Sequence, residues 1–278
     1  MVASLRSRWL GQQMRDLRDD RGLTLRYVAV QVGFEYADVK AFEHGERVLH
    51  HAQVTALLDA YGVYEQRVRD RLLSLARDAF RLSRWEDDFY APDLDVSMLD
   101  NLWLESIAER VSCYGATLVP DLLRVSGYVE AVVHRDFGPA VVEEQVRWWV
   151  RAIRDRQERF DGEPAGLRVV VTESVLHRPV GGNGDAARLQ LAHLGKAADR
   201  GQMRVLPSRA AYVSGMDASF TVFGLPQPYP RTVASTSHVH DAAVHEGQAA
   251  QSYASVFDKL WAAALPASES AALITELM

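Results

Sequence analysis

Apolar side chains recur at three- and four-residue spacing through the first eighty residues, which is the pattern of helices with one buried face. Glycines mark two of the expected boundaries: Gly22 stands where the first helix should end, and Gly33 where the second should turn. Thr24 can cap the second helix, because its hydroxyl can accept a hydrogen bond from a free backbone N–H. The predicted helices cover residues 9–20, 24–32, 35–43, 51–61 and 65–81.

The rest of the chain mixes helical periodicity with short β-rich runs. The run LRVVVT predicts a buried strand at 167–172. Further strands are predicted over 203–206, 219–223 and 231–240, and helices over 99–111, 120–134, 141–160, 186–200, 247–264 and 268–278. The pattern therefore predicts a multidomain chain, with an all-α N-terminal domain followed by an α+β C-terminal domain.

A change of composition indicates where the two domains meet. Trp85, Phe89, Tyr90 and Pro92 stand among acidic residues there. We therefore expect an N-terminal domain over 1–62, a connecting helix and linker over 63–90, and a C-terminal domain over 91–278. Charges fill one side of the connecting helix, as on a solvated surface or a dimer-forming connector.

Composition indicates where in the cell the protein acts and excludes two kinds of cysteine site. No apolar run is long enough to cross a membrane, and no apolar stretch follows the N-terminal arginines, so we expect a cytoplasmic protein without a secretory signal. The single cysteine, Cys113, excludes an intramolecular disulfide and a cysteine-based zinc site. The net charge is −6, and residues 1–82 hold 13 basic and 11 acidic side chains. The acidity therefore belongs to the C-terminal part, and the N-terminal part is weakly basic for a DNA-binding domain.

The segment over residues 23–45 has the order helix, glycine turn, helix that a helix-turn-helix requires. Ala29 is small where the two helices must cross, Gly33 supplies the turn, and Val39 would lock the second helix against the first. In this geometry the exposed N-terminal part of the second helix enters the major groove. The residues expected at or near DNA are Arg26, Tyr27, Tyr36, Lys40 and Arg47.

This segment resembles the XRE (Cro/C1-type) helix-turn-helix family. Its ending, Phe42-Glu43-His44-Gly45-Glu46-Arg47, is similar to the family signature I-E-x-G-x-R. The resemblance implies a regulator that binds DNA.

The C-terminal part resembles the Scr1-type regulator domain of actinobacteria, the family DUF5753. Residues 118–123 with Gly127 and Tyr128 are similar to its stretch LVPGLLQTxxYA, and residues 172–182 to its stretch DEAALRRPVGG. Residues 205–207 and 219–223 match two shorter stretches, and the helix around 257–260 also matches. The resemblance implies an antitoxin-like transcription regulator that is often encoded with a small partner protein.

Three residues depart from the DNA-reading pattern. Leu25 stands where family members usually have a glutamine that bonds a phosphate. Glu35 and Asp38 stand at the start of the recognition helix, where serine, threonine and basic residues are usual. An acidic side chain can read cytosine, but two carboxylates with little basic support weaken the attraction to phosphate. The sequence therefore leaves two alternatives open: the domain still binds DNA, or its affinity for DNA is weakened.

A second departure lies near the predicted strand 231–240. His238 and His240 would point to the same face of a strand, with His245 and Glu246 nearby. Three interpretations stay open: ordinary surface or pocket histidines, contact with a ligand or acid–base catalysis, and a divalent metal site. We expect no metal and no cofactor.

Other candidate ligand-binding residues follow the strand 167–172 or lie on the helix 141–160. Glu173, His177 and Arg178 come just after the strand, where pocket residues often lie, although a structural salt bridge is an equal alternative. Trp148 could line a pocket or a dimer face, and packing is the simpler interpretation. The glycine-rich run 181–184 could hold a phosphate but lacks the P-loop signature, and Ser174 lacks the context of a hydrolase nucleophile.

These patterns favour a DNA-binding regulator that forms a homodimer and senses a small molecule or a small partner protein, without membrane contact. The alternative is a helix-turn-helix scaffold recruited as a biosynthetic enzyme or small-molecule-binding protein, with weak or lost DNA binding. His238, His240 and Glu173 would then be the catalytic candidates. A third possibility is a protein-interaction module paired with a toxin- or antitoxin-like partner.

Overall fold

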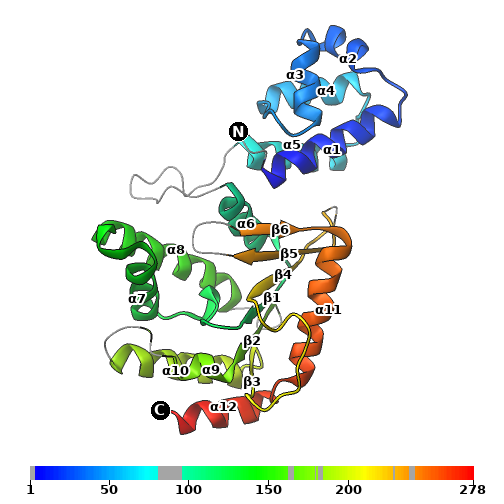
Figure 1. The fold of residues 1–278 in the computed structure, drawn as a ribbon. Coiled ribbons are helices and arrows are strands. Elements are labelled where there is room, and N and C mark those ends of the chain that lie inside the picture. The colour runs from blue at the N-terminus through cyan, green and yellow to red at the C-terminus, as the bar shows by residue number, and fades with distance from the viewer. Residues whose placement is uncertain are drawn as a thin grey trace. The chain divides into compact units, whose positions relative to one another are not determined.

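The computed structural model describes residues 4–80, 96–161, 166–178, 180, 184–227, 229–237 and 242–278 (Figure 1). Contacts divide them into two compact units. The first holds residues 4–80 with 96–100, and the second holds the described residues from 101 to 278. The first unit is helical and the second combines a sheet with helices, which confirms the predicted fold class.

The first unit is built from five helices. They are α1 (Leu5–Asp19), α2 (Leu25–Val32), α3 (Tyr36–Glu43), α4 (His51–Ala60) and α5 (Gln66–Phe80). The helix α1 begins earlier than predicted because the hydroxyl of Ser4 caps it, accepting the N–H of Ser7 at 3.1 Å. The helix α5 packs against α1 and α4. Apolar side chains from all five helices fill one core, among them Leu10, Met14, Val28, Val39, Phe42, Val54, Leu57 and Leu72.

Local signals in the sequence set the turn between α2 and α3. Thr24 caps α2 by accepting the N–H of Tyr27 at 3.2 Å, as predicted. Gly33 ends α2 with a φ of 70°, a left-handed conformation that glycine adopts without strain. Gly11 has a different role, because a Cβ there would lie 2.6 Å from the carbonyl oxygen of Phe42. The first helix therefore approaches the end of α3 at a distance that only glycine allows.

The second unit is organised around one mixed sheet. Its strands are β1 (Arg110–Gly115), β2 (Leu167–Thr172), β3 (Met203–Leu206), β4 (Phe220–Gly224), β5 (Thr232–Ser237) and β6 (Ala242–His245). They lie in the order β3-β2-β1-β4-β5-β6. The first three strands are parallel to one another, and β4, β5 and β6 continue the sheet with antiparallel pairing.

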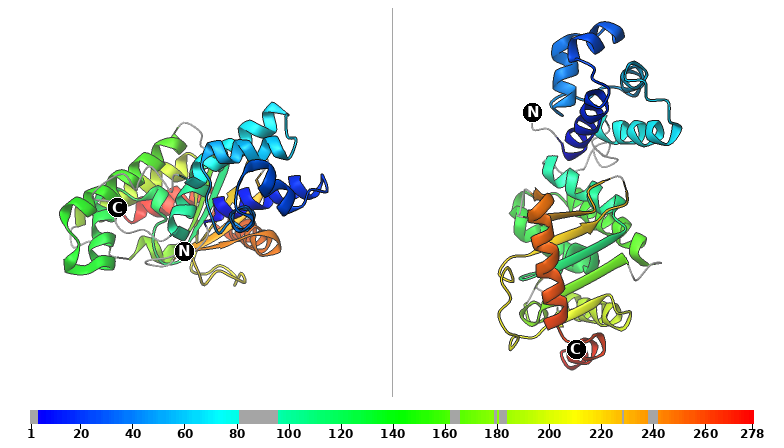
Figure 2. Two further views of the ribbon diagram at one scale, coloured as in Figure 1. Left: turned by 90° about the horizontal axis from the view of Figure 1, so that it is seen from above. Right: turned by 90° about the vertical axis from the view of Figure 1, so that its right-hand side faces the viewer.

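Helices cover both faces of this sheet. The helix α11 (Gly247–Ala263) lies along one face, and Figure 2 shows the green helices of residues 126–161 on the other. Phe257 and Leu260 of α11 pack against Tyr114, Val170 and Phe220 of the sheet in a buried cluster. The other helical elements are α6 (Val96–Ile107), η1 (Asp121–Leu123), α7 (Ser126–Phe137), η2 (Gly138–Ala140), α8 (Glu143–Asp161), α9 (Glu173–Leu176), α10 (Gly184–Asp199) and α12 (Ala267–Glu276).

Two helix predictions for this unit were wrong in part, and the strand β6 was missed. The predicted helix 99–111 ends at Ile107, and residues 110–115 form the strand β1. The segment 120–134 holds the short turn η1 before α7, which begins only at Ser126. The strand β6 was not predicted at all, because its four residues carry no alternation long enough to detect. The predicted strand 231–240 corresponds to β5, and its last three residues lie outside the described part of the chain.

Candidate nucleic-acid interface and ligand sites

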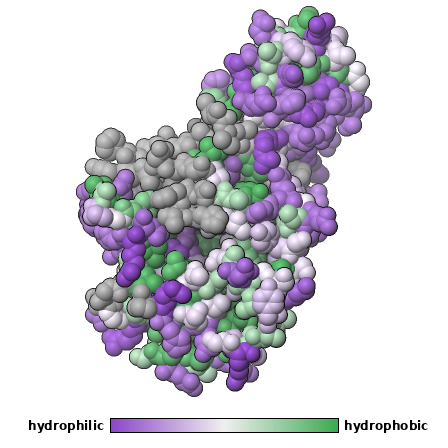
Figure 3. Space-filling view, viewed as in Figure 1, coloured by the Kyte–Doolittle hydropathy of each residue, from purple (hydrophilic) through white to green (hydrophobic). Residues whose placement is uncertain are grey.

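The five residues predicted at DNA all reach the surface of the helix-turn-helix unit. Arg26 and Tyr27 lie on the first turn of α2, and Tyr27 is 51% exposed. Tyr36 and Lys40 lie one turn apart on α3, and Tyr36 is 46% exposed. Arg47 follows α3 and is also exposed. The surface of this unit is mostly hydrophilic in the view of Figure 3.

An ion pair changes the electrostatics of the recognition helix. The guanidinium of Arg47 donates a hydrogen bond to the carboxylate of Asp38, and both side chains remain partly exposed. One of the two acidic residues on this surface is therefore neutralised within the unit. The other, Glu35, is exposed at the N-cap of α3 and makes no capping hydrogen bond with its side chain.

The inner face of α3 carries a buried polar network. The carboxylate of Glu43, at the end of α3, accepts hydrogen bonds from Arg18 of α1 at 2.8 Å and from the hydroxyl of Tyr61 at 2.7 Å. Glu43 and Tyr61 are almost fully buried. The bond to Glu43 raises the pKa of Arg18, and burial followed by the charge of Glu43 raises that of the Tyr61 hydroxyl. The network joins three helices and fixes the C-terminal end of α3.

The sequence analysis placed Glu43 in the family signature but gave it no role. Its partners are 25 and 18 residues away in the chain, so spacing alone does not reveal them. The only available signal is the charge itself: an acidic residue on the predicted buried side of a helix needs a buried partner.

The residues that follow β2 lie at the carboxyl end of the parallel strands. The carboxylate of Glu173 accepts the N–H of Ser208 at 2.7 Å, and this bond lowers the pKa of Glu173, with a smaller contribution from His177. Glu173 thus links the segment that follows β2 to the segment that follows β3. His177 and Arg178 are exposed just beyond α9. The hydroxyl of Ser174 shares a hydrogen bond with the hydroxyl of Thr172 at 2.9 Å, an arrangement that does not activate a serine for hydrolysis.

Of the three remaining residues predicted at a ligand, one is buried and two lie outside the described part of the chain. Trp148 is 2% exposed and packs edge-on against Trp149, with ring centroids 5.1 Å apart. This burial argues against the predicted ligand contact, because a large indole on the inner face of α8 stabilises the domain by packing. His238 and His240 lie outside the described residues, as do residues 181–183 of the glycine-rich run. Nearby in the chain, His245 forms a hydrogen bond with the hydroxyl of Thr236 at 3.2 Å, and its ring packs at a tilt against Tyr253.

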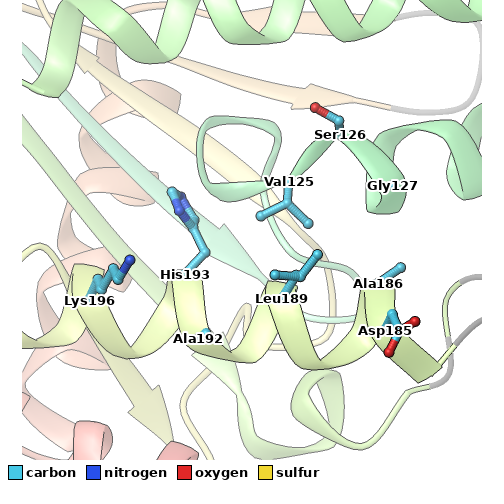
Figure 4. Close-up of a pocket in the computed structure, with 9 residues that line it drawn as sticks. All are labelled: Val125, Ser126, Gly127, Asp185, Ala186, Leu189, Ala192, His193 and Lys196. Carbon is cyan, nitrogen blue, oxygen red and sulfur yellow. The ribbon is translucent and has the colours of Figure 1, made fainter.

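A groove that the sequence analysis missed lies between the start of α7 and one face of α10. Its cavity volume is about 500 Å³. Figure 4 shows the lining side chains of both segments around it. They are Val125, Ser126, Gly127, Asp185, Ala186, Leu189, Ala192, His193 and Lys196. The two segments are about sixty residues apart in the chain, so only the fold brings them together.

Comparison with known proteins gives two family matches. A family model described as a domain of unknown function, DUF5753, matches residues 99–276, and one described as a helix-turn-helix domain matches residues 9–72. The two matches confirm the layout that the sequence resemblance predicted. No match was found among curated proteins or among solved structures. Within the described residues, no helix is long and apolar enough to cross a membrane.

Proposed function

Because the chain belongs to the DUF5753 family and carries a helix-turn-helix domain of the DNA-binding kind, we propose that it is an XRE-type transcription regulator. It binds DNA as a homodimer through the first unit. The C-terminal domain binds a small molecule or a small partner protein and thereby biases the dimer. The regulator acts in the cytoplasm.

The division of α3 into two faces is the observation that supports this proposal. Val39 and Phe42 anchor the inner face in the core, while Tyr36, Ala37 and Lys40 are exposed on the outer face. A helix held in this way can enter the major groove without disturbing its own fold. The outer face offers one ammonium, a tyrosine hydroxyl and a small methyl group, which suit guanine, phosphate and thymine respectively.

We expect Lys40→Glu to abolish DNA binding, because it replaces the one cation on the outer face of α3 with a charge that phosphate repels. The probe is DNA selected by the wild-type protein from a random duplex library, tested in a mobility-shift assay at fixed salt. Lys259→Glu makes the same charge change on α11 in the other unit and should leave the affinity unaltered. Unchanged binding by Lys40→Glu would refute the placement of this helix at DNA.

Asp38→Asn should act in the opposite direction. It removes a carboxylate from the DNA-facing side and releases Arg47 to contact phosphate. We expect the affinity to rise by about three- to tenfold and the salt dependence to steepen by about one phosphate contact. The measurement is fluorescence anisotropy with the selected DNA over a range of salt concentrations.

A matched control for this variant is Asp59→Asn. Asp59 is also an exposed acid of the first unit held by an arginine, Arg69, but it lies on α4. It should change neither affinity nor salt dependence. An equal gain from both variants would mean that net charge alone is responsible, and that Arg47 has no particular role.

The alternative function is a helix-turn-helix scaffold recruited as an enzyme or a small-molecule-binding protein. Leu25 and Glu35 favour it, because neither can donate a hydrogen bond from its side chain to a phosphate. The selection experiment separates the two candidates. If no duplex is enriched even at low salt, DNA binding has been lost and the alternative is preferred.

A further inference from the structure

The groove between α7 and α10 has an apolar floor. Val125 precedes α7, and Ala186, Leu189 and Ala192 line the groove from α10. Leu189 is 63% exposed, more than any other leucine in the described part of the chain. Exposed apolar surface inside a hollow is typical of a binding site, because a ligand that covers it removes it from water.

Basic side chains occupy one end of this groove. His193 and Lys196 follow Leu189 by one and two helical turns, so the three residues share a face of α10. Figure 4 shows all three on the side of the helix that faces the start of α7. Asp185 lies at the other end, about 16 Å from Lys196 along the helix axis at the usual rise per residue. Among the described residues that line the groove, His193 and Lys196 therefore favour an anionic group at their end, and Asp185 disfavours one at the other.

The walls of the groove are fixed before any ligand binds. Gln190 is buried behind the floor, where its amide accepts the N–H of Val125 at 2.9 Å and donates to the carbonyl of Leu123 at 2.6 Å. These bonds hold the start of α7 against α10. A Cβ on Gly127 would lie 3.2 Å from that of Ala186, so glycine keeps the approach close. A rigid site of this kind avoids part of the entropy cost of binding.

We propose that this groove binds a small organic anion with an apolar body. The apolar body lies on Val125 and Leu189, and the anionic group lies between His193 and Lys196. This site would be the place where the C-terminal domain binds the small molecule of the proposed function. The proposal rests on that function only for the claim that the bound ligand regulates the dimer. Direct binding can be measured without DNA, so loss of DNA reading and failure of this site are distinguishable.

The experiment compares two fluorescent probes on the full-length protein. Anilinonaphthalene sulfonate carries an aromatic body and one negative charge, and phenylnaphthylamine has the same aromatic body without the charge. For the wild-type protein we expect saturable binding of the sulfonate. Lys196→Glu should weaken the sulfonate by about tenfold, since an attraction is replaced by a repulsion at a partly solvated site. It should leave the neutral probe within about twofold.

Leu189→Gln tests the apolar half of the same site. It should weaken both probes by about threefold or more, because the contact that it removes does not depend on charge. Lys259→Glu, which makes the same charge change on α11, should leave both affinities as in the wild type. Circular dichroism and melting of each variant show that it is folded. Equal sulfonate affinity in the wild type and in Lys196→Glu would overturn the proposal, as would equal loss of both probes in that variant.

Discussion

Glu43→Gln will destabilise the helix-turn-helix unit by about 3–5 kcal/mol, because it removes the buried counter-charge of the Arg18 guanidinium and leaves it paired with the more exposed carboxylate of Asp19. Glu43 is 1% exposed in its side chain and takes three hydrogen bonds from Arg18, in addition to the bond from Tyr61. A neutral amide can replace some of these bonds but not the charge. Loss of this charge should weaken the packing of α1, α3 and the end of α4 against one another.

Hydrogen exchange followed by mass spectrometry can measure this effect in each unit separately. Peptides from the core of residues 4–80 should exchange about a hundredfold faster or more, as expected from about 3 kcal/mol. Peptides from the sheet of the second unit should be unchanged. Glu46→Gln is the control, since Glu46 is exposed three residues further on. Wild-type protection in Glu43→Gln would show that the network contributes little.

Arg156→Met should have a comparable effect in the second unit. Arg156 lies on α8 with only 9% of its side chain exposed, and it donates to Glu105 of α6 at 3.3 Å and to Asp121 of η1 at 3.2 Å. Removing it leaves the buried carboxylate of Glu105 without its ion-pair partner. We expect a loss of about 3–5 kcal/mol. Arg154→Met, on an exposed turn of the same helix, is the matched control and should be nearly neutral.

The defect of Arg156→Met should also depend on pH. Burial raises the pKa of Glu105 even in the wild type, although Arg156 opposes the rise. Without Arg156 that pKa rises further, so the folded state holds a proton that the unfolded state releases. Stability is then lost as the pH increases from the ordinary carboxyl pKa to the raised one, and the defect should be larger near pH 8 than near pH 5.

Urea denaturation at the two pH values provides the measurement. The double variant Arg156→Met/Glu105→Gln should recover part of the stability near pH 8, because it no longer buries an unpaired charge. It should also lose the excess pH dependence. A defect that is the same at both pH values would contradict the assignment to Glu105.

Local signals predicted the first unit better than the second. Thr24 and Gly33 act within one helical turn of their own positions, so the sequence is sufficient to place the boundaries of α2. The strand β1 depends instead on β2 and β4, which pair with it from segments more than fifty and a hundred residues away. Its residues RVSCYG contain too few β-branched or aromatic side chains to be recognised alone.

The candidate sites show the same limit. Residue type and motif were enough to select Tyr36 and Lys40 as exposed residues of the recognition helix. They could not reveal the pairing of Asp38 with Arg47, which depends on how the chain turns after α3. The groove was missed because its two walls come from separate segments, and neither wall carries a motif of its own.

The two faces of α3 also bear on how the protein can evolve. Val39, Phe42 and Glu43 hold the helix in the unit, while Tyr36, Ala37 and Lys40 are exposed. Exposed substitutions away from special features usually change stability by about half a kcal/mol or less. Mutations on the outer face can therefore alter the preferred DNA sequence, or abolish DNA binding, without removing the folded domain. Descendants of one such gene could change operators while their architecture stays the same.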